Sequence, residues 1–365
     1  MKIKLSQAFD LQMGKTPARN NAAYWNGSKK WVSIADIGNS GKYISDTKEC
    51  ITDRGVRESG IKAVPKETVI MSFKLSIGKT AITAEELYTN EAIMAFIDKG
   101  IYAIDPTYFY HLCCGKNWTA GTNKAVMGLT LNKATISGIE INIPDIAEQR
   151  KIAARLDRLD TVIADRQLQL EYLDYLVKSR FIELFGEPQR NPHGYKHIKL
   201  SDIATYYNGL TYKPENIAAE GTIVLRSSNI QNSQLDFADT VRVDCAIKER
   251  LMVQNNDILM CSRNGSAKLV GKVAMIKDIQ EPMSFGAFMM IIRSHYFGYL
   301  MTYFQMDAFR QQIKTGATTT INQITGRMLD DVTIPLPPMA LVDQFAAFVE
   351  QTDKSKLCGK MEVVA

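Results

Sequence analysis

The sequence contains one ordered series of motifs twice, and this duplication constrains the fold more than any other feature. The tetrapeptide IKLS begins at Ile3 and again at Ile198, an offset of 195 residues. The other recurring elements are, in chain order, Gly14 with Gly209, Thr16 with Thr211, VIMS at Val69 with ILMC at Ile258, GKTA at Gly78 with GKVA at Gly271, Gly121 with Gly316, and GIEINIP with DVTIPLP. A repeat of this length is a whole domain, so we predict two tandem domains rather than a solenoid.

Each copy is predicted to be a mixed α/β domain rich in strands. In the first copy, TVIMSFKLSIGKTAI reads as two strands joined by a basic loop, and TYFYHLCCGKNW begins as a helix. Both copies end in a short apolar strand closed by proline, and a Gln and a helical pattern follow, at Gln149 and Gln344. The predicted order in each copy is therefore domain, proline, helix.

A stretch of 40 residues without Pro or Gly, from Ile146 to Phe185, separates the two copies. Apolar residues recur there every three or four positions, as in a coiled-coil seam that basic Arg166 and Arg180 interrupt. The seam consists of Leu156, Leu159, Ile163, Leu170, Leu173 and Val177. Such a helix would reach roughly 60 Å, which favours a spacer between two domains over a long core helix. After the second copy, the spacing of Leu341, Phe345, Phe348 and Thr352 predicts a second helix of at most about 20 residues.

Composition is that of a soluble globular protein, with 45% hydrophobic and 23% charged residues. The polar start MKIKLSQAFD lacks a signal-peptide core, and no run approaches a membrane span. We therefore expect a cytoplasmic protein whose six cysteines are free thiols. The net charge of +5 is the sum of an excess of four basic residues in 1–145 and three in 188–337 and an excess of one acidic residue in each of 146–187 and 338–365. This distribution permits a polyanionic partner without requiring one.

Motifs for catalysis are missing from the sequence. The GKT at Gly78 has Phe73 where a phosphate-binding loop requires glycine, and in the second copy the spacing of Gly265 and Gly271 is one residue too long. The four histidines form no HExxH motif or Cys/His cluster, and Asn191-Pro192-His193 fails the motif of an amino-methyltransferase. We therefore expect no catalytic residue and no metal site in this chain.

Two sets of loop residues, at parallel positions of the duplicated domains, are suited to DNA. Arg and Lys suit phosphate and guanine, Asn suits adenine, and short hydroxyls suit backbone oxygens. The predicted set in the first copy is Lys15, Thr16, Ser72, Lys74, Ser76, Lys79, Asn123 and Lys124. The predicted set in the second copy is Arg226, Asn229, Arg263, Asn264, Ser266, Lys268, Thr318, Thr319 and Thr320. Each residue alone could equally be an ordinary exposed side chain, but their parallel placement strengthens the case.

The segments EQRKIAARLDRLD and VKSRFIELFG lie between two domains that each end in a Pro-bounded strand. With PPMALVDQFAAFVEQTDKSK near the end of the chain, this arrangement resembles the specificity subunit of type I restriction-modification enzymes. The resemblance implies two target recognition domains, at 1–145 and 188–337. It implies a central spacer helix at 146–187, and a shortened second spacer helix with a tail at 338–365.

The resemblance also implies a function and a set of partners. Each recognition domain would read one half of a bipartite site in double-stranded DNA, and the paired helices would set the gap between the halves. DNA adenine methyltransferase subunits would dock on the helices, where Tyr172, Tyr175 and Leu176 are candidate contacts. A restriction and translocase subunit would complete the complex. S-adenosylmethionine, ATP and magnesium would belong to these partners, so the chain itself needs no cofactor.

Three alternatives remain open from the sequence. The shortened second helix allows a truncated, inactive or recombination-variant specificity subunit, in which docking of a methyltransferase on that side is in doubt. The long helix also allows a non-catalytic interaction protein with no DNA role. A nuclease or methyltransferase that acts alone would need motifs that the sequence does not display.

Overall fold

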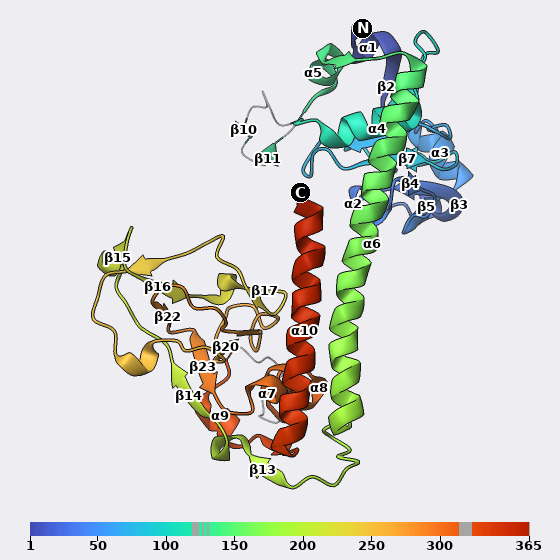
Figure 1. Cartoon of the computed structure of the whole chain (residues 1–365). Coiled ribbons are helices and arrows are strands. Elements are labelled where there is room, and N and C mark those ends of the chain that lie inside the picture. The colour runs from blue at the N-terminus through green and yellow to red at the C-terminus, as the bar shows by residue number, and fades with distance from the viewer. Residues whose placement is uncertain (119–123, 126–127, 130, 314–322, 365) are drawn as a thin grey trace. The chain divides into compact units, whose positions relative to one another are not determined.

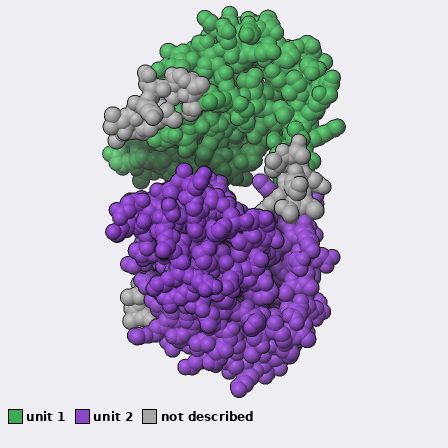
Figure 2. Space-filling model, turned by 60° about the vertical axis from the view of Figure 1, so that its left-hand side comes forward, with its two compact units in different colours: residues 1–164 green, residues 165–365 purple. Residues whose placement is uncertain are grey.

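The computed structural model describes residues 1–118, 124–125, 128–129, 131–313 and 323–364. The chain forms two compact units, Met1–Ala164 and Asp165–Ala365, which Figure 2 colours separately. The boundary falls inside the continuous helix α6, Ile146–Phe185, so each unit contains part of that helix. Within the described residues, no helix is both long and apolar enough to cross a bilayer.

Unit 1 contains a five-stranded and a three-stranded sheet, as the strand-rich prediction requires. The larger sheet has the order β2 (Phe9–Met13), β9 (Ile93–Asp98), β6 (Val69–Ser72), β7 (Thr80–Thr83) and β4 (Tyr43–Ile44). The smaller has the order β5 (Glu49–Ile51), β3 (Trp25–Val32) and β8 (Tyr88–Thr89), with β3 and β8 parallel. A core around Phe9, Phe96 and Phe109 lies between the larger sheet and helix α4 (Pro106–Gly115).

Unit 2 repeats this arrangement with two four-stranded sheets. One has the order β14 (Thr205–Asn208), β23 (Met289–Arg293), β20 (Ile258–Cys261) and β21 (Val273–Met275). The other has the order β15 (Ile217–Ala218), β19 (Arg242–Val243), β16 (Thr222–Leu225) and β22 (Met283–Phe285), with β16 and β22 parallel.

The other α-helices that precede α10 (Met339–Val364), and two further strand pairs, are short. In unit 1 they are α1 (Leu5–Ala8), α2 (Ile34–Asn39), α3 (Asp53–Ser59), α5 (Lys133–Gly138) and the strand pair β10 (Lys124–Ala125) and β11 (Gly128–Leu129). In unit 2 they are α7 (Phe297–Tyr303), α8 (Asp307–Ile313), α9 (Gly326–Asp330) and the pair β17 (Ile230–Gln231) and β18 (Gln234–Leu235).

The two IKLS segments confirm the predicted duplication, because each opens its unit and pairs with the strand that closes it. In unit 1, β1 (Lys2–Lys4) pairs with β12 (Glu140–Asn142), and Ile3 lies opposite Ile141. In unit 2, β13 (His197–Lys199) pairs with β24 (Thr333–Pro335), and Ile198 lies opposite Ile334. Both pairs are antiparallel, so the proline-bounded strand returns the chain to the start of its unit before a helix begins.

Helix α10 (Met339–Val364) is longer than the sequence predicted, with 26 residues rather than about 20. Figure 1 shows it beside the C-terminal part of α6, within unit 2. The two helices run antiparallel, because Phe345 packs on Phe181 and Phe185 while Lys356 pairs with Asp174 farther back along α6. The helix that contains Leu341, Phe345, Phe348 and Thr352 continues beyond Thr352 and through Gly359.

Candidate nucleic-acid interface

The loops predicted to meet DNA are anchored by the same backbone hydrogen bonds in both units. Three bonds of unit 1 have counterparts in unit 2 with N···O distances of 2.9–3.2 Å. In unit 1, the backbone amides of Gly14, Asn90 and Phe73 donate to the carbonyls of Ile93, Val32 and Ala92, respectively. In unit 2, the amides of Gly209, Gly286 and Ser262 donate to the carbonyls of Met289, Leu225 and Phe288, in the same order. These bonds define equivalent positions in the two units, and Lys74 is therefore equivalent to Arg263.

Glycine is required at the first of these positions. A Cβ on Gly14 would lie 2.1 Å from the carbonyl oxygen of Thr89, and one on Gly209 would lie 2.1 Å from that of Gly286. Both distances are far inside van der Waals contact, so the strand end and the neighbouring turn can approach only without a side chain. The glycines that recur in the sequence thus hold a tight junction next to the candidate interface.

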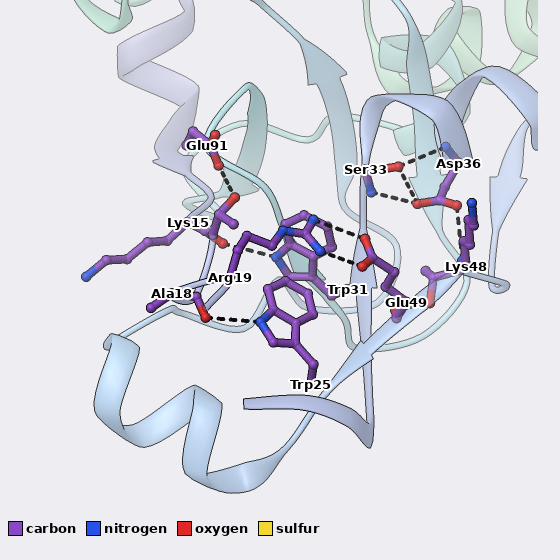
Figure 3. Close-up of polar contacts among 12 residues, drawn as sticks. Lys15, Ala18, Arg19, Trp25, Trp31, Ser33, Asp36, Lys48, Glu49 and Glu91 are labelled. Carbon is purple, nitrogen blue, oxygen red and sulfur yellow. Dashed lines mark hydrogen bonds and ion pairs between the residues drawn. The ribbon is translucent and has the colours of Figure 1, made fainter. Parts of the chain in front are cut away.

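In unit 1, the loop after Gly14 is clamped by aromatic residues that the sequence analysis did not select (Figure 3). The Trp31 indole N–H donates to the Lys15 carbonyl at 3.0 Å, and the Trp25 indole N–H donates to the Ala18 carbonyl at 3.2 Å. The Arg19 guanidinium lies 4.0 Å from the Trp25 ring centroid, and the Glu49 carboxylate binds its other edge. These contacts fix the backbone that carries the predicted Lys15 and Thr16.

The predicted side chains on this loop already have protein partners. The exposed Lys15 ammonium donates to the Ser59 carbonyl, and the half-buried Thr16 hydroxyl donates to the Glu91 carboxylate. Both partners sit at the surface, so DNA would compete with them rather than meet free groups. Whether either side chain contacts DNA stays a prediction.

Four predicted residues lie at the end of β6 and in the loop that leads to β7, and they are of two kinds. Ser76 and Lys79 are exposed, and Lys74 is half-buried with its ammonium 5.2 Å from the Phe73 ring centroid. Ser72 is fully buried, and its hydroxyl donates to the Ser76 carbonyl and accepts from Lys79 N–H at 3.0 Å. The expectation that Ser72 faces DNA is therefore corrected, because its hydroxyl holds the turn together.

The loop after β16 in unit 2 also contains one partly exposed residue and one that is buried. Arg226 is half-buried and donates to Asp239 at 2.7 Å. Asn229 is 1% exposed, accepts from Arg226 N–H at 2.8 Å, and donates to the carbonyls of Asp236 and Asp239. Its expected contact with DNA is also corrected, because the amide is used inside the protein. The equivalent contact in unit 1 runs from Ser33 N–H to the Asp36 carboxylate at 2.7 Å (Figure 3).

The loop between β20 and β21 carries the other described candidates of unit 2. Arg263, Ser266 and Lys268 are exposed, and Asn264 is half-buried. The Asn264 amide accepts from Ser266 N–H at 3.0 Å and donates to the Ser227 hydroxyl at 3.3 Å, so it joins this loop to the one after β16. Beside Arg263 lies Phe288, which the sequence analysis missed although its ring is 61% exposed.

The loops after β14 and β16 and the turn between β22 and β23 form a cleft of about 530 Å³ in unit 2. Its lining includes Thr211, Tyr212, Arg226, Ser227 and Phe288. Aromatic faces, hydroxyls and one guanidinium are groups that suit nucleic-acid bases and phosphates.

Several predictions lie outside the described residues. These are Asn123, Thr318, Thr319, Thr320, the repeated Gly121 and Gly316, and the side chain of Lys124, whose backbone belongs to β10.

The predicted partner-binding residues lie along one face of α6 in unit 2. Tyr172, Tyr175 and Leu176 are 63%, 70% and 47% exposed, and Leu168 one turn earlier is 46% exposed. Spacings of four, three and one residues place these four side chains on one stripe of the helix. The seam residues Leu170, Leu173 and Val177 are half-buried on the other face of the helix, whereas Leu159 and Ile163 in unit 1 are exposed.

A polar junction in unit 1 joins α6 to α4, and no sequence motif predicted this contact. His111 on α4 lies 2.7 Å from an Asp157 oxygen and 3.9 Å from Asp160, and Lys42 lies 2.7 Å from the other Asp157 oxygen. Burial raises the pKa of Asp157, but the hydrogen bonds from Lys42 and His111 outweigh it and hold this pKa below its usual range. The histidine and two aspartates lie close enough to hold a cation, yet the Lys42 ammonium already neutralises Asp157. This junction therefore fits a structural role.

Comparison with known proteins agrees with this architecture. The sequence profile of the type I restriction modification DNA specificity domain matches residues 1–172 and 192–357. The chain therefore belongs to the type I restriction modification DNA specificity domain family.

Individual relatives come from archaea and bacteria. The chain is 24% identical to the type I restriction enzyme MjaIX specificity subunit of Methanocaldococcus jannaschii, over 95% of this chain and 85% of the relative. It is 28% identical to the EcoKI specificity subunit of Escherichia coli, over 45% of this chain and 38% of the relative. These proteins are specificity subunits of restriction enzymes, which agrees with the resemblance found in the spacer segments.

Solved structures show the same fold. One, from work on the assembly and conformational transition of a type I restriction-modification system, matches with a TM-score of 0.61 and 17% identity over all of this chain and 92% of that one. The S subunit of M. genitalium matches with a TM-score of 0.53 and 14% identity over the same fractions.

Proposed function

We propose that this chain is the DNA specificity subunit of a type I restriction-modification complex and reads a bipartite site in double-stranded DNA. The observation that carries the proposal is the duplicated frame, in which equivalent backbone hydrogen bonds support exposed basic loops in both units. Family membership gives the biological context. One chain with two readers and one shared helix selects two half-sites at a fixed gap, because the binding of the second half becomes intramolecular.

In this proposal the chain selects the DNA and catalyses nothing itself. Adenine methyltransferase subunits and a restriction and translocase subunit supply the chemistry, with S-adenosylmethionine, ATP and magnesium bound to them, in the cytoplasm. The stripe formed by Leu168, Tyr172, Tyr175 and Leu176 supports docking on α6, because four large exposed side chains on one helix face form an apolar surface that a partner protein would bury. Replacing Tyr175 with Asp should release the methyltransferase without unfolding unit 2, which co-elution and circular dichroism together would check.

Selection from a randomised duplex library tests the DNA-reading role. The chain is assembled with its methyltransferase subunit, and selection is run at two salt concentrations, since phosphate contacts weaken steeply with salt. Two short motifs at one fixed gap are expected. A well-folded complex that enriches no motif would contradict the proposal and favour an interaction protein without a DNA role.

The two glycine junctions allow each half-motif to be assigned to its unit. The Gly209→Ala variant should lose the half-motif of unit 2 and keep the other, and Gly14→Ala should do the opposite. Loss of both half-motifs from either variant would contradict independent reading by the two units. Hydrogen exchange of the untouched unit controls for unfolding of the whole chain.

A further inference from the structure

We propose that Arg263, held against Phe288, reads a guanine in the half-site of unit 2, and that Lys74 at the equivalent position of unit 1 makes no such selection. The inference rests on the proposed DNA-reading function and names one specificity-determining residue for it. Neither the family match nor the relatives assign any residue to a base.

The backbone that carries Arg263 is fixed to the turn that carries Phe288. The amides of Ser262 and Arg263 both donate to the Phe288 carbonyl at 3.0 Å, and the Ser262 hydroxyl donates to the same oxygen at 3.0 Å. On the other side of Arg263, Asn264 joins the loop to Ser227. A base-reading side chain needs such a rigid support, because its donors must meet two acceptors at once.

The Arg263 side chain is exposed and has an aromatic wall. Its guanidinium carbon lies 5.8 Å from the Phe288 ring centroid, within range of a cation–π contact. Among the described residues, no carboxylate forms an ion pair with Arg263, and the residue is exposed. Phe288 itself is 61% exposed, so the aromatic wall beside the guanidinium is open to solvent.

The neighbouring arginine is placed differently. Arg226 is paired with Asp239 at 2.7 Å, and its side chain is 36% exposed. Its guanidinium is therefore already matched by a carboxylate and helps to hold the loop after β16. Of the two predicted arginines in unit 2, only Arg263 presents its donors without an acidic partner within the described part of the chain.

Unit 1 has different chemistry at the equivalent positions. Lys74 replaces Arg263, and Ala92 replaces Phe288, so the ring that would hold the cation is missing there. The Lys74 ammonium lies instead over the preceding Phe73, at 5.2 Å. An ammonium is a compact point charge without the planar fork of a guanidinium, and it suits a phosphate better than a base edge.

Guanine is the base that matches an arginine fork. Its O6 and N7 are two adjacent acceptors in the major groove, whereas adenine presents one acceptor and one donor. An exposed, supported and uncompensated guanidinium therefore selects guanine over the other bases. We expect a fixed guanine in the half-motif of unit 2.

The test uses library selection with the assembled complex and three variants. Arg263→Lys keeps the charge and removes the fork, and Lys248→Arg, at an exposed lysine of unit 2 outside the predicted DNA-contacting set, is the control. The Arg263→Lys complex should lose roughly tenfold or more of its preference at one guanine. Its other half-motif and the gap should stay unchanged. Lys248→Arg should select the wild-type site, and both single variants should unfold at the wild-type temperature.

The third variant transfers the reader to unit 1. Lys74→Arg combined with Ala92→Phe should add a guanine preference to the half-motif of that unit. A wild-type bipartite motif without a guanine in the unit 2 half, or one that Arg263→Lys leaves intact, would overturn this inference and leave the proposed function standing. A wild-type complex that selects no bipartite motif would overturn both.

Discussion

The two units build the same frame but hold their helices by opposite means. Unit 1 holds the N-terminal part of α6 through polar contacts, with Gln149 fully buried and Asp157 bridging Lys42 and His111. Unit 2 holds the C-terminal part of α6 and helix α10 through an aromatic cluster of Phe181, Phe185, Tyr299 and Phe345. Polar contacts fix a helix in one rotation and register, whereas aromatic burial supplies more stabilisation per residue.

The Phe181→Ala variant tests this difference and should cause the largest loss of stability. Phe181 is fully buried against three aromatic rings, so the change should lower the free energy of unfolding of unit 2 by about 4 kcal/mol. Tyr175→Ala, on the exposed face of the same helix, is the matched control and should cost little. Hydrogen exchange, measured separately for amides of the two units, would show the loss. An equal loss of protection in unit 1 would refute a separate aromatic anchor.

The polar anchor is tested by Gln149→Leu. The Gln149 amide donates to the carbonyls of Ala103 and Pro144 and accepts from Asp105 N–H, each at 2.9 Å. Leucine would remove the hydrogen-bond partner of all three part-buried groups at once, so unit 1 should lose about 3 kcal/mol.

Gln344→Leu is the matched control for that experiment. Gln344 follows the proline of the second copy in the sequence, but it is exposed on α10. Its replacement should change stability by less than about 0.5 kcal/mol. Urea denaturation would measure both variants, and equal effects would remove the asymmetry between the two anchors.

This pair of glutamines shows what the sequence could and could not predict. The duplicated frame was predictable, because the glycine junctions and the Pro-bounded strands require particular residue types at fixed positions. The role of Gln149 was not, because its Ala103 partner lies 46 residues away and no local pattern encodes that contact. Ser72 and Asn229 failed for the same reason, since a polar residue type does not tell whether its partner is water, DNA or a buried backbone group.

A smaller effect is expected at the junction between α4 and α6. Because the pKa of Asp157 is lowered by folding, its carboxylate stabilises unit 1 above the pKa of an unfolded aspartate, about 3.9, and this contribution is lost as the pH falls further. Asp157→Asn should cost about 1 kcal/mol at pH 7, a modest value because the side chain is still 37% exposed and solvent screens it.

The pH dependence separates this ionic contribution from simple loss of packing. The difference between wild type and Asp157→Asn should shrink as the pH falls below about 4. Urea denaturation of both proteins at pH 7 and at pH 3.5 would measure this difference in the free energy of unfolding. Hydrogen exchange of the α4 amides would show whether the loss is at the junction. A difference that stays constant between the two pH values would show that the charge of Asp157 is not what stabilises the junction.

The smallest expected effect concerns how the two units meet DNA, and Lys74→Ala tests it. If Lys74 contacts a phosphate, its loss should weaken binding equally for all sequences and should lower the slope of log K against log salt by about 0.9. Lys66→Ala is the matched control, because Lys66 is an exposed lysine at the opposite end of strand β6. Binding is measured by fluorescence anisotropy across a salt series on the selected site and on single-base variants of it. A loss of discrimination at one base pair, with an unchanged salt slope, would mean that Lys74 reads a base as we propose for Arg263, and the contrast between the two units would then disappear.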